Sequence, residues 1–191
     1  FGAVELFKKA KKRDIKPILG CEAYVAPRSR LDKGSVDSEV HHFHLILLVK
    51  NEDGYRNLCR LVTRSYIEGF YYRPRIDKEL LAAHSKGLIG LSSCLKGEVN
   101  YLVGKGLEAD AERVAGEYAD IFAKGDFYLE LQDHGLPLQK TVNAGIVRLA
   151  AKTGLPLVAT NDVHYLRKED AESHDVLLCV QTNKKVSDQD R

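Results

Sequence analysis

Apolar and polar positions follow two periods along the chain, and together they predict a mixed α/β fold. Apolar residues at helical spacing predict helices at about residues 3–13, 52–69, 78–84, 97–103, 109–123, 138–153 and 168–181. Short apolar runs predict five strands at residues 18–25, 43–49, 88–92, 127–132 and 155–160. The polar segment at residues 26–39 is predicted to be a mobile loop. Strands that alternate with helices favour a parallel sheet or a barrel.

The composition is that of a folded globular protein. Of the 191 residues, 44% are hydrophobic and 29% are charged, and no run approaches the roughly 20 apolar residues of a membrane span. The four cysteines form no CxxC pair, and without a secretory signal we expect reduced thiols in a cytoplasmic protein. A net charge of +2 does not indicate a dedicated nucleic-acid binder. The chain has no methionine and begins inside a predicted helix, so we expect it to be an internal piece of a longer protein.

Side chains that can bind a metal ion stand at or near the ends of the predicted strands. Asp162 and His164 follow the last strand, and both would point the same way if this segment stayed extended. Glu22 interrupts the apolar run ILGCEAYV, and a buried carboxylate needs a cation, a metal or a proton as its partner. His42 and His44 introduce the second strand and would share a face. Because the C-terminal ends of parallel strands lie at one edge, we expect these residues to converge.

Two more strand ends carry such side chains, and each candidate also has an ordinary alternative. Cys94 follows the third strand and His134 follows the fourth. A lone cysteine is more often a small core residue, His134 could begin a turn with Gly135, and Glu22 could form a structural ion pair. Five successive strands with metal-capable side chains nevertheless favour a shared metal site.

The chain contains, in this order, the segments GCEAYVAPRSR, HHFHLILLVKNEDGYRNLCRLVTRSY, GLIGLSSCLKGEV, FYLELQDHGLPLQ and GLPLVATNDVHYL. Together they resemble the PHP (polymerase and histidinol phosphatase) family, and in particular the PHP domain of bacterial replicative DNA polymerase III alpha subunits. The resemblance covers essentially all of residues 1–191. It implies a distorted seven-stranded (β/α) barrel, similar to a TIM barrel, of which about five strands are present here.

The same resemblance implies a cluster of two or three divalent metal ions, with zinc or manganese preferred over magnesium. The family's ligand positions match Glu22, His44, Cys94, Asp162 and His164, with His134 and His42 as further candidates. Family members begin with two strands that carry H-x-H and T-D-H motifs, which this sequence lacks, so residues 1–191 are expected to be a partial PHP domain. The strand at residues 18–25 would then have an unpaired edge, and the barrel would not close.

For function, the resemblance implies a DNA-directed DNA polymerase of DNA replication whose nucleotidyl transfer lies in a domain downstream. Its PHP domain would hydrolyse phosphoesters or proofread as a 3′–5′ exonuclease. The implied partners are DNA, a separate proofreading exonuclease and a sliding clamp, with no membrane. Two alternatives stay open: a non-catalytic scaffold for polymerase stability or exonuclease docking, and a free-standing PHP phosphatase.

A separate feature is the segment GFYYRPRIDK, in which aromatic and cationic side chains adjoin. Tyr72, Arg73 and Arg75 could bind nucleic acid, because aromatic rings stack on bases and guanidinium groups neutralise phosphates. They could equally anchor a loop.

Overall fold

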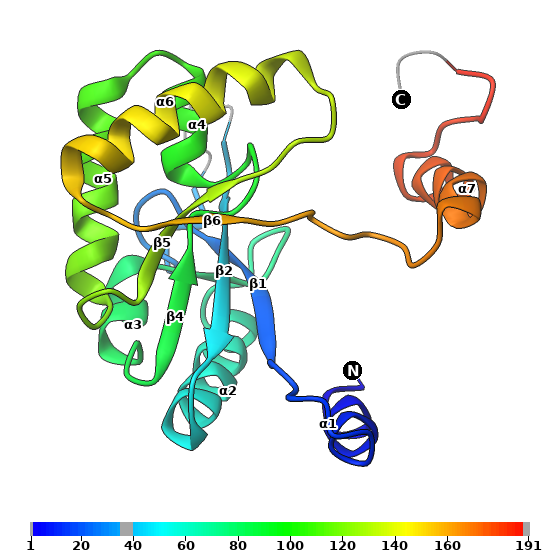
Figure 1. The fold of residues 1–191 in the computed structure, drawn as a ribbon, viewed down its shortest axis with the longest axis horizontal. Coiled ribbons are helices and arrows are strands. Elements are labelled where there is room, and N and C mark those ends of the chain that lie inside the picture. The colour runs from blue at the N-terminus through cyan, green and yellow to red at the C-terminus, as the bar shows by residue number, and fades with distance from the viewer. Residues whose placement is uncertain (1, 35–39, 189–191) are drawn as a thin grey trace. The chain divides into compact units, whose positions relative to one another are not determined.

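The computed structural model of the protein describes residues 2–34 and 40–188, so part of the loop expected at 26–39 lies outside the described residues. The chain forms two compact units, Phe1–Thr160 and Asn161–Arg191, and each is described by itself. The first unit holds the sheet (Figure 1). In the described ranges, no helix is long and apolar enough to cross a membrane.

Most predicted elements are present with nearly the expected bounds. The strands of the first unit are β1 (Gly20–Val25), β2 (Phe43–Val49), β3 (Arg75–Ile76), β4 (Leu88–Leu91), β5 (Phe127–Leu131) and β6 (Leu157–Ala159). Its helices are α1 (Ala3–Lys11), α2 (Glu52–Ile67), α3 (Lys78–Ala83), α4 (Glu98–Gly104), α5 (Glu108–Ile121) and α6 (Pro137–Thr153). The mixed α/β prediction is therefore confirmed.

Helix ends follow from local capping. The side chain of Asn51 accepts a hydrogen bond from the backbone N–H of Gly54 at the start of α2, and that of Asp77 accepts one from Leu80 at the start of α3. At the end of α6, Gly154 adopts a left-handed backbone with φ 73°, as expected from the sequence.

The strand order is β3-β1-β2-β4-β5-β6, and one strand runs against all the others. β2 is antiparallel to both of its neighbours, whereas the pairs β1–β3, β4–β5 and β5–β6 are parallel. The expectation of a purely parallel arrangement is therefore wrong for β2. No helix separates β1 from β2 in the described residues, and antiparallel neighbours do not require the crossover that parallel strands need.

The sequence pattern misses the short strand β3, which pairs with β1. β1 consequently has a partner on each side at Tyr24 and Val25, and the expectation that its edge would be unpaired is wrong at these two residues. The edges of the described sheet are β3 and β6, and these six strands do not close on themselves. The open sheet agrees with the expectation that the barrel would not close in residues 1–191. The seven-stranded barrel of a complete domain stays a prediction.

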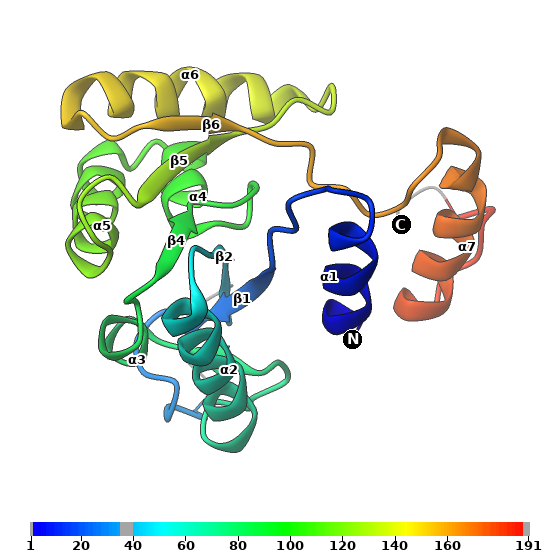
Figure 2. The ribbon, with the colours of Figure 1, turned by 60° about the horizontal axis from the view of Figure 1, so that its bottom comes forward.

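The two faces of the sheet differ in polarity. Val25, Leu45, Leu47 and Leu129 lie on one face and are at most 1% exposed, because residues of α2–α6 pack with them in a single apolar cluster. Figure 2 shows α6 running beside β5 and β6 on this side. The opposite face carries alternate residues of the same strands and includes polar side chains. The candidate ligands Glu22 and His44 lie on that second face.

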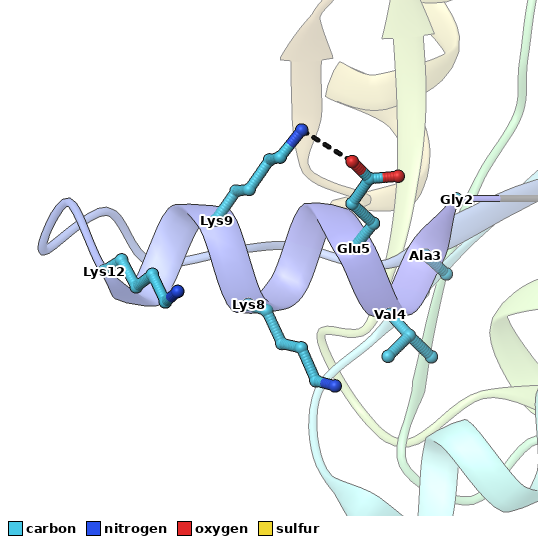
Figure 3. Close-up of a pocket in the computed structure, with 7 residues that line it drawn as sticks. All are labelled: Gly2, Ala3, Val4, Glu5, Lys8, Lys9 and Lys12. Carbon is cyan, nitrogen blue, oxygen red and sulfur yellow. Dashed lines mark ion pairs between the residues drawn. The ribbon is translucent and has the colours of Figure 1, made fainter.

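Helix α1 is amphipathic and basic. Figure 3 shows residues that line a surface pocket at this helix, with an ion pair of 2.5 Å between Lys9 and Glu5. Lys9, Lys8 and Lys12 line this pocket together with Glu5, and no candidate metal ligand lies there.

In the second unit, the predicted helix at 168–181 is resolved into two parts. A turn of 3₁₀ helix, η1 (Lys168–Asp170), leads into α7 (Ala171–Thr182). The Asp170 carboxylate accepts a 3.0 Å hydrogen bond from the backbone N–H of Arg167, which fixes the start of this segment.

Candidate metal centre

The antiparallel pair β1–β2 brings Glu22 and His44 together. His44 lies opposite Tyr24 and Glu22 lies opposite Ile46, so all four side chains are on the same face of the sheet. The His44 Nδ1 atom is 3.4 Å from the Glu22 Oε1 atom, and the imidazole is largely buried with 12% of its side-chain surface exposed. The charged position within the first apolar strand thus has an imidazole as its neighbour.

The loop after β4 carries the third donor to the same point. It runs beside the start of β2, where the N–H of His44 donates a 3.0 Å hydrogen bond to the carbonyl of Lys96 and a bridge joins His44 to Gly97. This contact leaves Cys94 Sγ 3.7 Å from His44 Nδ1. A carboxylate and a thiol therefore both lie near the Nδ1 atom of one imidazole.

These neighbours change the proton affinity of the imidazole. Burial by itself lowers the pKa of His44, but the hydrogen bonds with Cys94 and Glu22 outweigh it and raise the pKa to about 9. The metal-free protein therefore carries a proton on this ring at neutral pH. A metal ion at Nδ1 would have to replace that proton.

His42 lies next to this cluster, as the shared-face prediction requires. Its ring stacks on that of His44 with centroids 5.8 Å apart, and it meets Tyr24 edge-on at 4.6 Å. Burial, with the charges of His44 and Arg73, lowers the pKa of His42 to about 4. Its buried Nδ1 has no hydrogen-bond partner among the described residues. A neutral ring with an unused nitrogen has the protonation state that a metal ligand needs.

Buried polar residues that the sequence reading did not single out support the Cys94 loop. Ser92, Ser93, Asn100 and Glu130 are each at most 4% exposed and are joined by hydrogen bonds. Gln132, 7% exposed, extends this network toward Thr160. A signal was present in the sequence, because Glu130 interrupts the apolar run FYLEL just as Glu22 interrupts its own strand.

Asp162 and His164 lie in the second unit. β6 ends at Ala159, and Asp162 has a left-handed backbone with φ 47°, so the segment is not extended there. The His164 Nδ1 atom lies 2.6 Å from the backbone carbonyl oxygen of Asp162. The strand-alternation argument for this pair is therefore wrong, and their assignment rests on the sequence motif alone.

His134 occupies an exposed turn after β5. Its Nδ1 is 2.8 Å from Nε2 of Gln139, and its backbone N–H donates to Oε1 of the same side chain. Gly135 follows with φ 77°. The turn expected at this glycine is present, and the role of His134 as a ligand stays a prediction.

The basic aromatic segment divides into exposed and structural residues. Tyr72 is 74% exposed, and Arg73 is also exposed, with its guanidinium over the ring of Tyr24. Arg75 is 4% exposed and donates to the carbonyls of Asp32 and Gly69. Its burial and these hydrogen bonds give Arg75 a structural task inside the fold, and its contact with nucleic acid stays a prediction.

The donor set suits a borderline or soft divalent ion. Imidazole, carboxylate and thiolate together favour zinc over magnesium, which prefers oxygen ligands. Among residues 2–34 and 40–188, no three histidine, cysteine, aspartate or glutamate side chains already form a group able to hold an ion. The four cysteines lie in these ranges, and none forms a disulfide, so the Cys94 thiol is available.

Known proteins are similar to this chain along its whole length. The PHP domain profile matches residues 1–134. DNA polymerase III subunit alpha of Treponema pallidum is 48% identical over 191 residues, that of Thermus aquaticus 49% over 193, and that of Deinococcus radiodurans 45% over 193. Each match covers 100% of this chain but only 14–16% of the relative. The chain belongs to the PHP domain family.

Proposed function

We propose that this chain is the PHP portion of a replicative DNA polymerase III alpha subunit, a DNA-directed DNA polymerase of DNA replication. Two findings support this proposal: the names of the relatives, and their similarity to this chain along all of its 191 residues. Because the chain spans about a sixth of those relatives, nucleotidyl transfer is assigned to other parts of the longer protein.

Within that protein, residues 1–191 are proposed to be a partial PHP domain that binds divalent metal ions, with zinc or manganese favoured. The observation that carries this is the meeting of Glu22, His44 and Cys94 around one ring nitrogen. His42 is a further candidate ligand beside them. Asp162, His164 and His134 are proposed on the family's motif order only.

The reaction class proposed for the complete centre is phosphoester hydrolysis, including 3′–5′ exonucleolytic removal of nucleotides. Bound divalent ions would polarise the phosphate and lower the pKa of a water molecule. The chain's own groups have simpler tasks. Glu22 would offset the positive charge of the ions, Cys94 would supply a sulfur ligand, and the buried position of His44 would limit access of bulk water.

The partners proposed for the intact protein are DNA, a proofreading exonuclease subunit and a sliding clamp, in the cytoplasm. A replicative polymerase acts on a DNA template, and the exonuclease and the clamp would act with it on that same template. A scaffold that stabilises the polymerase or docks the exonuclease, and a free-standing PHP phosphatase, are the alternatives that the experiment must separate.

The test uses the intact protein with and without the double substitution Asp162→Asn, His164→Ala. We expect the unsubstituted protein to retain zinc or manganese in elemental analysis and to shorten a 5′-labelled primer, and we expect the double variant to lose both properties. His84→Ala, outside the cluster, serves as the control.

The other outcomes are equally informative. Unchanged metal content in the double variant contradicts the ligand assignment. If the unsubstituted protein retains metal but does not shorten the primer, the scaffold is favoured. If it hydrolyses a small phosphate ester and has no polymerase activity, the free-standing phosphatase is favoured.

A further inference from the structure

We propose that Glu130 is a positioning residue for Cys94, a role that rests on the metal site proposed above. Glu130 lies on β5, and its Oε2 accepts a 2.9 Å hydrogen bond from the backbone N–H of Ser93. Ser93 directly precedes Cys94. The carboxylate would therefore set the backbone from which the thiol reaches His44.

Ser93 needs this support because its backbone conformation is unfavourable. Its φ is 67°, in the left-handed region that non-glycine residues rarely occupy. The Asn100 amide donates a 2.9 Å hydrogen bond to the carbonyl oxygen of Ser93. The N–H and the C=O of Ser93 are thus both held by buried side chains, and that carbonyl belongs to the peptide that leads into Cys94.

The chemistry of Glu130 matches an acceptor and not a proton donor. Besides the N–H of Ser93, it accepts from Nε2 of Gln132 at 3.0 Å and from the hydroxyl of Thr160. The residue is 3% exposed, and these three described partners are all neutral donors. Three donated hydrogen bonds stabilise a buried carboxylate that would otherwise be costly.

Gln132 permits a sharp choice of substitutions. Its Oε1 is buried and has no hydrogen-bond partner among the described residues. If Glu130 became glutamine, Gln132 could turn its amide and accept from the new NH₂ group, while the new carbonyl kept the hydrogen bond to Ser93. Glu130→Gln is therefore the rescuing variant, and Glu130→Ala is the disrupting one.

The experiment loads the intact protein with Co²⁺ in place of the native ion and records the thiolate-to-cobalt charge-transfer absorption. Cys94→Ser identifies which part of this absorption comes from Cys94. Asp77→Ala is the matched control for stability, because Asp77 is also a buried carboxylate that accepts backbone N–H groups, but at the N-terminal cap of α3.

We expect Glu130→Ala to lose the Cys94 absorption and to weaken Zn²⁺ binding by about 10- to 100-fold. Glu130→Gln should keep the absorption, and Asp77→Ala should keep it despite lower stability. An undiminished absorption in Glu130→Ala, or an equal loss in Asp77→Ala, overturns the positioning role.

Two further outcomes concern a variant that does not fold and a protein that shows no cobalt absorption from Cys94. If Glu130→Ala does not fold, Glu130→Asp replaces it, since the shorter side chain should fail to reach Ser93; equal absorption in Glu130→Asp and Glu130→Gln then overturns the proposal. If the unsubstituted protein shows no absorption that depends on Cys94, the metal assignment itself fails, which separates that failure from the failure of the positioning role.

Discussion

His44 lies opposite Tyr24 in an antiparallel strand pair, so the first residues of β2 lie beside the last residues of β1. β4 is also antiparallel to β2 and brings its own C-terminal end, with the Cys94 loop, to the same edge. A histidine at the beginning of one strand thereby meets donors from two others. This relationship makes His44 the centre of the cluster and defines the first prediction.

Replacing His44 by alanine should lower the zinc content of the intact protein at least about tenfold. The variant would lose the imidazole that lies beside both Glu22 and Cys94. His41→Ala is the matched control, since His41 is exposed and belongs to the same short run. The measurement is elemental analysis after dialysis against a weak chelator. Equal zinc in the two variants would contradict the assignment.

Gly97→Ala should displace the Cys94 loop and destabilise the protein by about 1–3 kcal/mol. A Cβ atom at Gly97 would lie 1.8 Å from the carbonyl oxygen of Ser92, a backbone atom that cannot easily move. Gly116→Ala, in α5, meets nothing within 4 Å and should be neutral or stabilising by up to about 1 kcal/mol. Urea denaturation compares the two, and similar effects would refute the steric argument.

Asp77→Ala should be among the most destabilising single changes, at about 3–5 kcal/mol. Asp77 is buried, pairs with the guanidinium of Arg30 at 3.0 Å and caps α3, so its removal leaves a buried cation without this partner. Asp53→Ala breaks an exposed pair with Lys86 and should change stability far less. Thermal unfolding of both variants is the check.

Acid should weaken the fold partly through Glu68. Hydrogen bonds from Arg30 first, and from Arg64, hold the pKa of Glu68 below its ordinary value of 4.5. The folded state therefore binds fewer protons than the unfolded state, so this stabilisation is full above that value and is lost as the pH falls through the lower, folded pKa. Glu68→Gln should flatten the acid limb of a stability–pH curve, and an unchanged limb would disprove this contribution.

Nucleic-acid binding by the aromatic segment is expected only from its exposed residues. The double substitution Tyr72→Ala, Arg73→Ala should weaken single-stranded DNA binding by the intact protein and reduce the salt slope by about 1. Arg56→Ala, which removes another exposed guanidinium, is the control. If both variants bind DNA equally, the segment anchors a loop and does not bind nucleic acid.

The sequence pattern was sufficient where an element is long and its apolar period is clear. The strand predicted at 43–49 has those bounds in the structure, and α6 ends at Thr153, directly before the capping residue Gly154. β3 could not be found in this way, because two residues, Arg75 and Ile76, contain no period. They become a strand only through pairing with β1.

For the site, the sequence revealed which residue types are present but not which of them lie close together. The sequence singled out Glu22, His44 and Cys94, and the structure brings these three together. It did not single out Glu130, although Glu130 interrupts an apolar run as Glu22 does. Such a charge reveals that a partner is needed without revealing which one. The hydrogen bond to Ser93 joins residues 37 positions apart.

By itself, the sequence determined the helices and most of the strands, because periodicity records which side chains are buried. It also supplied the candidate donors of the proposed metal site. Tertiary structure decided the direction of β2 and the support of the Cys94 loop. The physical reason is that an apolar run is the same whether its neighbour is parallel or antiparallel, whereas hydrogen bonding between strands distinguishes the two. That choice placed His44 beside Glu22 and Cys94.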